Sequence, residues 1–191
     1  NTLAWTHPKS LHSSEVAWQK AMLRRAKKFA DAVIVPSHAV AAQLAEIVAF
    51  GDRVRVIEHG ASPTLTLPVD AEWRAQRLSL PERYILAQGN LDPRRGLTDL
   101  IAALAEPELA DVSLLIVGGE SWNDVTLESV LTQTGVSASR VTALGRVSNA
   151  DLAVLYDRAD AFILPSRAVG FGLPALEAFT FGTPVVMSDD A

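Results

Sequence analysis

Two glycines and a glutamate near the end of the chain have the types and spacing to bind a phosphorylated nucleoside. Gly170 and Gly172 lie between an apolar run, ADAFILPS, and the segment LPALEAFTFG, which we predict to be a strand and a helix. Because these glycines carry no side chain, a phosphate could reach main-chain N–H groups, and the positive end of the helix would add to the attraction. Glu177 would lie about one and a half turns into the helix, where its carboxylate could accept hydrogen bonds from ribose hydroxyls. The pattern predicts a nucleotide or nucleotide-sugar site, although short glycine motifs also occur as plain tight turns.

A cationic loop supplies a second candidate anion site. The segment GNLDPRRGL, residues 89–97, places Arg94 and Arg95 between Gly89, at the end of a predicted strand, and a predicted helix. Guanidinium groups bind phosphates in a bidentate manner and keep their charge. The alternative is a pair of solvated arginines with Asp92 as their local partner. We expect this loop and the glycine turn to converge over one crevice, so that a diphosphate is held from two sides.

The composition is that of a globular protein without a general nucleic-acid-binding role. Of the 191 residues, 49% are hydrophobic, and 22 acidic against 17 basic residues give a formal charge of −5, whereas binding to a phosphate backbone needs a basic surface. The absence of cysteine excludes disulfides and thiolate metal sites. No apolar run approaches the roughly 18 residues of a membrane-spanning helix. We expect a cytoplasmic protein.

From residue 83 onward, short β-branched runs alternate with amphipathic segments. This alternation predicts an α/β domain with a doubly wound parallel sheet that helices cover on both faces. The predicted strands are residues 83–88, 112–118, 140–144, 160–164 and 183–188. Ligands of such sheets bind beyond the carboxyl ends of the strands. The turn residues that fall there are Gly89, Gly118, Gly119, Gly145 and residues 166–172.

The first eighty residues predict only part of a second Rossmann-like domain. We expect a helix from Ser13 to Ala30, then a strand, a helix and a strand in the segments DAVIVPS, SHAVAAQLAEIV and RVRVIEHG. So few elements leave much apolar surface uncovered, and the chain opens on NTLAWTHP without Met, so we expect a missing amino-terminal part. The Pro-containing segment GASPTLTLP indicates a connection. The predicted division is an incomplete domain at 1–62, a linker with a lead-in helix at 63–82, and a nucleotide-binding domain at 83–191, shortened at its end.

Four segments together resemble the nucleotide-sugar domain of GT-B glycosyltransferases of group 1, the GT4 type: YILAQGNLDPRRGLTDLIAAL, LLIVGG, VTALGRVSNADLAVLYDRADAFILPS and GFGLPALEAFTFGTPVVMSD. The segments before residue 63 are similar to the end of that family's acceptor-binding domain. The resemblance implies a retaining enzyme that moves a hexose from a nucleotide-sugar to a glycan or lipid-linked acceptor, as in cell-envelope polysaccharide biosynthesis, without a metal or other cofactor. A GDP- or dTDP-linked hexose is the expected donor, and the isolated fragment is expected to be inactive.

The resemblance also implies roles for single residues. The donor diphosphate would be bound by Gly89, Asn90, Arg94 and Arg95, in an EPRK-like loop formed by residues 92–95. The donor sugar and the distal phosphate would meet the backbone of Val169, Gly170, Phe171, Gly172 and Leu173. Glu177 would bind the ribose, and main-chain groups of Arg146 and Val147 would contact the base. The catalytic residue is not identified within this chain.

Two positions depart from the family's pattern. Val169 occupies the place of the first glutamate in the E-x7-E motif, and valine cannot accept hydrogen bonds from sugar hydroxyls. Asn90 replaces an arginine that many relatives carry. A noncatalytic nucleotide-sugar-binding relative is therefore the alternative to an active transferase. A nucleotide-sugar epimerase is a second rival, but the acidic and histidine groups that it would need around the sugar are not found in the sequence.

Other residues give weaker signals. His7 and His12 have a poor spacing for a metal pair, and Asp189 with Asp190 more simply ends the last strand. The basic run RRAKK, residues 24–28, could contact anionic lipid at the inner membrane face, although a solvated helix face is the interpretation we favour. The tryptophans Trp5, Trp18, Trp73 and Trp122 are scattered and read as packing residues, with Trp122 a candidate for the cleft.

Overall fold

The computed structural model describes residues 2–189. The chain packs as two units: the first comprises Asn1–Gly60 with Ala168–Phe171, and the second comprises Ala61–Arg167 with Gly172–Ala191. The predicted domain limits at residues 62 and 83 remain predictions, because a division by packing does not show which segments fold alone.

The second unit is built on a five-stranded sheet in the order β7-β4-β3-β8-β9, in which every neighbouring pair is parallel. The α/β fold with a parallel sheet is confirmed, and each predicted strand overlaps an observed one. The strands are β3 (Tyr84–Gln88), β4 (Ser113–Val117), β7 (Val141–Gly145), β8 (Ala161–Leu164) and β9 (Val185–Met187).

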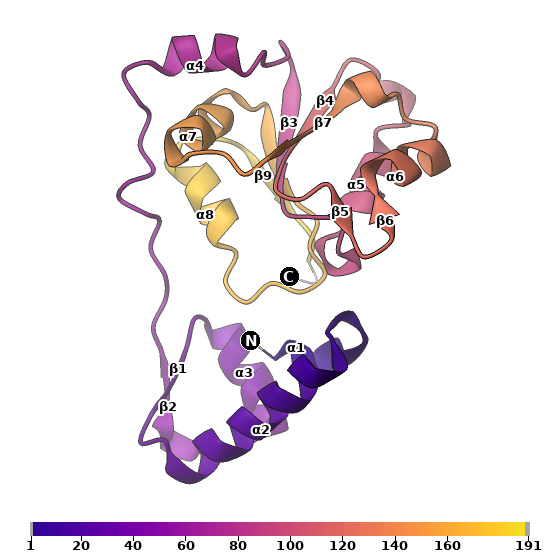
Figure 1. Ribbon diagram of the computed structural model, residues 1–191. Coiled ribbons are helices and arrows are strands. Elements are labelled where there is room, and N and C mark those ends of the chain that lie inside the picture. The colour runs from indigo at the N-terminus through magenta and orange to yellow at the C-terminus, as the bar shows by residue number, and fades with distance from the viewer. Residues whose placement is uncertain (1, 190–191) are drawn as a thin grey trace. The chain divides into compact units, whose positions relative to one another are not determined.

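Helices cover both faces of this sheet (Figure 1). On one face lie α5 (Leu97–Ala103) and α6 (Leu127–Thr134), and on the other lie α7 (Asn149–Arg158) and α8 (Leu173–Thr180). Buried side chains of β3, β4 and the first pair of helices form one cluster, with Leu114, Ile101 and Val130 among its members. The chain crosses between strands through helices because parallel neighbours cannot be joined by a tight turn. All five carboxyl ends therefore meet at one edge of the sheet.

Short elements complete the second unit. The lead-in helix is α4 (Ala71–Arg77), and 3-10 turns form at η3 (Pro93–Arg95), η4 (Pro107–Leu109) and η5 (Ala138–Arg140). A two-residue antiparallel pair, β5 (Ser121–Trp122) with β6 (Val125–Thr126), was not predicted. Strands this short have no periodicity that a sequence pattern can detect. Trp122 packs against the buried cluster beside α6.

The first unit contains two parallel strands and three α-helices among the residues that the structure describes. Its elements are α1 (Leu3–Thr6), η1 (Pro8–Ser10), α2 (Ser13–Phe29), β1 (Val33–Val35), α3 (His38–Ile47), η2 (Gly51–Arg53) and β2 (Val54–Val56). The predicted long helix and the strand-helix-strand order are present. Val35, Val40, Leu44 and Phe50 form its small core. Within residues 2–189, no helix is both long enough and apolar enough to cross a membrane.

An ionic network joins α4 to α7 in the second unit. The Asp151 carboxylate accepts hydrogen bonds from Arg74 at 2.8 Å, Arg77 at 2.6 Å and the Ser148 hydroxyl at 2.7 Å. Burial by itself would raise the pKa of Asp151, but these three donors outweigh burial and lower the pKa from 3.8 to about 2. The lead-in helix is therefore held to the domain by charge as well as by packing.

We expect this network to make stability depend on pH in the acid range. Because the pKa of Asp151 is lower in the folded state, its contribution is complete above pH 3.8 and is lost as pH falls toward 2. Urea unfolding of Asp151→Asn should show a free energy of unfolding about 2 kcal/mol below that of the wild type at pH 7, with the difference closing near pH 2. Two curves that stay parallel from pH 7 to pH 2 would contradict the assignment.

Candidate donor-binding site

The carboxyl ends of β3, β4 and β7 are in direct backbone contact. Gly89 and Gly118 have φ angles of 145° and 140°, and a Cβ atom on Gly118 would lie only 1.9 Å from the Gly89 carbonyl oxygen. The Gly89 N–H donates to the Val117 carbonyl and the Gly118 N–H donates to the Gly145 carbonyl, both at 2.9 Å. Only glycine permits this approach, so the predicted turn residues 89, 118 and 145 are brought together at one edge.

Asp92 is the anchor of the cationic loop. Its carboxylate is 3% exposed and accepts hydrogen bonds from the Arg94 backbone N–H at 3.0 Å and from Arg94 Nε and Nη2. Burial alone would raise the pKa of Asp92, but the hydrogen bonds and charge of Arg94, with the charge of Arg95, lower it. The Arg94 guanidinium is thus used within the loop, where it fixes η3 in place.

Arg95 is placed differently from its neighbour. Its side chain is exposed, and its Cγ and Cδ atoms lie beside Gly89, where a Cβ on that glycine would be 3.5 Å from each. No hydrogen bond or ion pair joins its guanidinium to any residue in the range 2–189. Of the two predicted diphosphate-binding arginines, Arg95 therefore has the guanidinium that is available to an anion at the end of β3. Asn90, also predicted here, accepts a hydrogen bond from the Asp92 N–H through Oδ1 at 3.4 Å.

The loop after β8 is tied to the cationic loop. A Cβ on Gly96 would lie 2.1 Å from the Pro165 carbonyl oxygen, and the Arg167 N–H donates to the Arg94 carbonyl at 2.8 Å. The Arg167 guanidinium also bonds to Asp99 at 2.6 Å. Segments about seventy residues apart in the sequence thus form one continuous rim at the carboxyl edge.

A buried hydroxyl in this rim has no partner. Ser166 is 1% exposed, and its Oγ makes no hydrogen bond within the described part of the chain. An unpaired buried hydroxyl costs about 1–3 kcal/mol, which is most easily tolerated where a ligand or a water supplies the partner. Ser166 was predicted only as one of the turn residues 166–172, because its burial is visible only in the folded structure.

Glu177 lies in α8 and is held by a tyrosine from α7. The Tyr156 hydroxyl donates to Glu177 Oε2 at 3.3 Å, and Tyr156 itself is fully buried between the rings of Phe162 and Phe181. Burial raises the pKa of Glu177 above its ordinary value, and the hydrogen bond from Tyr156 opposes this only in part. The carboxylate is thus oriented by one donor and keeps acceptor capacity for others.

If Glu177 binds a ribose, ionisation of its carboxyl should control affinity. We expect GDP to bind wild-type protein about tenfold more tightly than 2′,3′-dideoxy-GDP, which lacks both ribose hydroxyls, and Glu177→Gln to abolish this difference. Because protonation removes acceptor capacity and the pKa is raised, affinity for GDP should weaken as pH falls from 7, and this dependence should be much smaller in the variant. Calorimetric titrations at several pH values measure both; an unchanged preference in Glu177→Gln would refute the ribose role.

The predicted glycine turn is shared between the two units. Gly172, with φ 82°, caps α8 in the second unit, and Leu173 is the first residue of that helix. Residues 168–171 pack with the first unit, where the Ser37 hydroxyl donates to the Gly170 carbonyl at 2.8 Å and the ring of Phe171 meets that of His59 edge-on at 5.2 Å. Val169 is half-buried. The convergence of Phe171 with Arg95 over one crevice stays a prediction.

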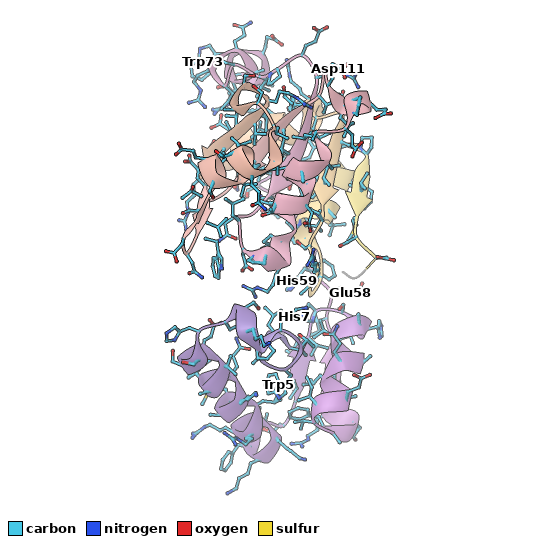
Figure 2. The ribbon with its side chains drawn as sticks, turned by 90° about the vertical axis from the view of Figure 1, so that its right-hand side faces the viewer. Trp5, His7, Glu58, His59, Trp73 and Asp111 are labelled. Atoms are coloured by element: carbon cyan, nitrogen blue, oxygen red, sulfur yellow. The ribbon has the colours of Figure 1, made fainter. Side chains whose placement is uncertain are left out.

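The remaining predicted residues lie at other places. Arg146 is exposed and Val147 half-buried in the loop after β7, and their contact with a base is untested. His7 and His12 bond locally to Thr6 and Ser14, and Figure 2 shows His7 with Trp5 in the first unit. Among residues 2–189, no group of three His, Asp or Glu side chains is placed to hold a metal ion. Asp190 lies outside the described residues.

A doubly wound parallel sheet with glycines and a cationic loop at its carboxyl edge has the arrangement at which open α/β domains bind their ligands. The family model "Glycosyl transferases group 1" matches residues 69–191. This chain belongs to that family.

Relatives and solved structures agree with this assignment. The chain is 35% identical over 132 residues to O-antigen chain mannosyltransferase B of Escherichia coli and 34% identical over 140 residues to D-inositol 3-phosphate glycosyltransferase of Mycobacterium tuberculosis. These matches cover 67% and 70% of the chain but only 33% and 28% of the relatives. Sucrose-phosphate synthase from Thermosynechococcus elongatus superimposes with a TM-score of 0.74 at 33% identity, over 90% of this chain and 44% of that one. Anabaena HepE, solved with UDP and glucose, gives 0.77 at 26% identity, over 95% and 50%. The fold is that of the GT-B glycosyltransferases.

Proposed function

We propose that this chain is the donor-binding part, with the end of the acceptor domain, of a retaining glycosyltransferase of the GT4 type. The enzyme would move a hexose from a nucleotide-sugar to a glycan or lipid-linked acceptor. The observation that carries the proposal is the available Arg95 guanidinium beside Gly89, at the edge where the backbones of Gly89, Gly118 and Gly145 meet. The family membership supports transfer chemistry, and the name of O-antigen chain mannosyltransferase B supports a glycan acceptor. The name D-inositol 3-phosphate glycosyltransferase points instead to a small phosphorylated acceptor in that relative.

In this proposal, residues of the chain bind each part of the donor, and no metal ion is required. Arg95 and the amino end of α8 would neutralise the leaving diphosphate. Glu177 would hold the ribose, and the backbone of residues 146–147 the base. Gly170, Phe171, Gly172 and Leu173 would enclose the distal phosphate and the sugar, with Asp92 and Arg94 keeping the cationic loop in shape.

A binding panel tests donor recognition by this chain directly. We propose a GDP- or dTDP-linked hexose as the donor, and UDP-glucose joins the panel because the neighbour HepE was solved with UDP and glucose. A ligand that binds only the folded state raises the thermal midpoint in proportion to its affinity. We expect one nucleoside diphosphate and its sugar to raise the midpoint well above the shift given by the free nucleoside. If UDP, GDP, ADP and dTDP and their sugars all leave the midpoint unchanged, the donor-binding role is refuted.

Val169 favours a second candidate, a noncatalytic nucleotide-sugar-binding relative. The side chain at this position is apolar and half-buried, so it offers no acceptor to sugar hydroxyls. Val169→Glu in the full-length protein separates the candidates through sugar transfer to acceptor. Transfer by the unchanged protein supports the transferase; no transfer before or after the substitution, with nucleotide binding intact, supports the binding protein.

A peripheral membrane contact at the cytoplasmic face is proposed for α2. Trp18, Met22 and Phe29 are 62%, 40% and 64% exposed, and their spacing places them on one face of the helix. Arg25 and Lys28 stack on the Phe29 ring at 5.6 and 5.1 Å, so cations border this apolar stripe. Sedimentation with vesicles containing phosphatidylglycerol should retain the protein and vesicles of phosphatidylcholine should not; equal retention would refute an electrostatic contact.

A further inference from the structure

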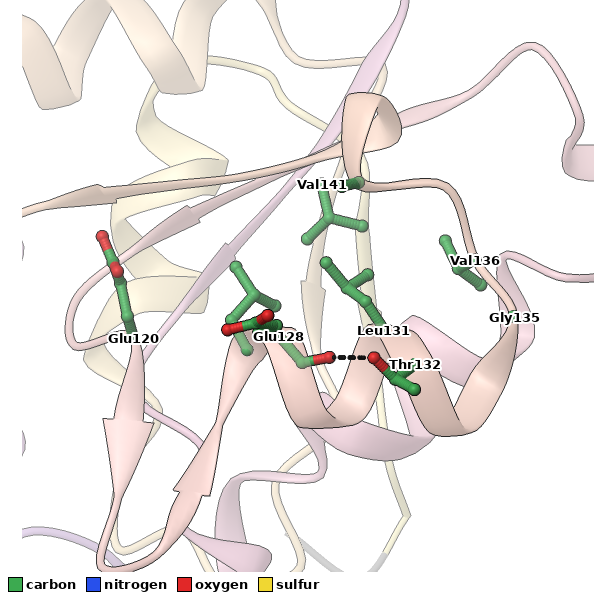
Figure 3. Close-up of a pocket in the computed structure, with 9 residues that line it drawn as sticks. Glu120, Glu128, Leu131, Thr132, Gly135, Val136 and Val141 are labelled. Carbon is green, nitrogen blue, oxygen red and sulfur yellow. Dashed lines mark hydrogen bonds between the residues drawn. The ribbon is translucent and has the colours of Figure 1, made fainter.

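A hollow of about 570 Å³ lies along the outer edge of the sheet in the second unit, beside β7 (Figure 3). Its volume is within the range of roughly 300–1,000 Å³ that is typical of small-molecule sites. The lining comes from α6, the turn after it, η5, β7 and the segment before β5: Glu120, Leu127, Glu128, Leu131, Thr132, Gly135, Val136, Ala138 and Val141. None of these residues belongs to the proposed donor site.

The floor of the hollow is apolar and firmly packed. Val136 and Val141 are 6% and 5% exposed, and Leu127 and Leu131 pack against the buried cluster between the sheet and its helices. Because these side chains are part of the domain core, the floor has a fixed shape. It offers an apolar ligand a surface that already exists before binding.

The two charged side chains of the hollow are carboxylates, and both lie toward one end. Figure 3 shows Glu120 and Glu128 at one end and Val136 with Gly135 at the other. Neither glutamate side chain forms a hydrogen bond or ion pair with residues 2–189. The Thr132 hydroxyl already donates to the Glu128 carbonyl at 2.9 Å, and the Leu127 N–H donates to the Glu120 carbonyl at 3.0 Å. What remains for a ligand is negative charge at one end and apolar surface beyond it.

We propose that this hollow binds a small organic cation in which a protonated amine is joined to an apolar ring or chain. The ammonium would donate to the carboxylates of Glu120 and Glu128, as charge-assisted hydrogen bonds. The apolar body would cover Leu131, Val136 and Val141. An anionic ligand is disfavoured by the same two carboxylates, and a neutral ligand of the same shape gains only the apolar contacts.

Three probes with the same ring test the charge requirement on the full chain. Equilibrium dialysis with 1-naphthylmethylamine, 1-naphthylmethanol and 1-naphthylacetate should show the amine binding at least tenfold more tightly than the alcohol, and the acid more weakly than both. In the double variant Glu120→Gln, Glu128→Gln the advantage of the amine over the alcohol should vanish while alcohol binding is kept. An amine that binds no better than the alcohol to the wild type, or equally well to both proteins, overturns the proposal.

Two tryptophan variants test the location. Ala138→Trp places a large ring in the hollow and should abolish binding of the amine, whereas Gln133→Trp, at an exposed position of α6 outside the lining, should leave it unchanged. Circular dichroism of both variants checks that the fold is kept. Binding that survives Ala138→Trp, or that UDP displaces in competition, would place the amine elsewhere and refute the site. The result does not depend on whether the protein transfers sugar.

Discussion

Gly118→Ala should lower the free energy of unfolding by about 3 kcal/mol, a large loss for the addition of a single methyl group. Two costs add. The φ angle of 140° is one that alanine adopts only under strain, and the new Cβ would lie 1.9 Å from the Gly89 carbonyl oxygen. That neighbour is backbone, fixed by the hydrogen bond from the Gly89 N–H to Val117, so it cannot swing aside as a side chain would.

The adjacent residue is a matched control. A Cβ on Gly119 would meet the Asn90 Cβ at 3.5 Å, an ordinary contact. Gly119→Ala should therefore change stability by no more than about 0.5 kcal/mol. Urea unfolding of both variants measures the contrast. Equal effects at the two positions would show that the contact between Gly89 and Gly118 is not what requires glycine. Because Gly89 begins the cationic loop, nucleotide affinity should fall in Gly118→Ala even under conditions where the variant is folded.

Arg95→Ala should weaken binding of a nucleoside diphosphate by about tenfold to a hundredfold and change stability only slightly. A charge-assisted hydrogen bond contributes roughly 1.5–3 kcal/mol, and about 1.4 kcal/mol corresponds to a factor of ten. The exposed guanidinium has no hydrogen bond or ion pair to lose within residues 2–189. Calorimetric titration with the diphosphate and with the free nucleoside distinguishes a phosphate contact from a general effect, because only the diphosphate should lose affinity.

Arg94→Ala should give the opposite pattern. Removing this guanidinium leaves the Asp92 carboxylate, which is 3% exposed, with only the backbone N–H of residue 94 as donor. Breaking a buried ion pair by removing one partner costs about 3–5 kcal/mol. The variant should therefore lose stability, and its affinity for the nucleoside diphosphate should fall only because the cationic loop loses its shape. If instead both alanine variants lose affinity equally with stability intact, the two arginines share the diphosphate and the role assigned to Asp92 is wrong.

The alternation of apolar and amphipathic segments was sufficient to predict the sheet. Five strands and the helices between them could be placed because burial on both faces leaves a near-continuous apolar pattern in each strand. The long helix α2 was also predicted, with its start at residue 13 and its end within one residue of the observed end. The short strand pair β5–β6 was not predicted, because four residues are too few to show the alternation of apolar and polar side chains that indicates a strand.

The sequence by itself also determined which chemistry is available: glycines after apolar strands, two adjacent arginines before a helix, and one carboxylate inside another helix. These follow from residue type and from distances along the chain. The tertiary structure decided how the groups are used. Arg94 and Arg95 look equivalent in sequence, and only the burial of Asp92 separates an arginine that holds the loop from one that faces outward. The contacts of Gly118 with Gly89 and of Tyr156 with Glu177 join residues 29 and 21 positions apart, and such contacts are fixed by how strands and helices pack, for which no local pattern exists.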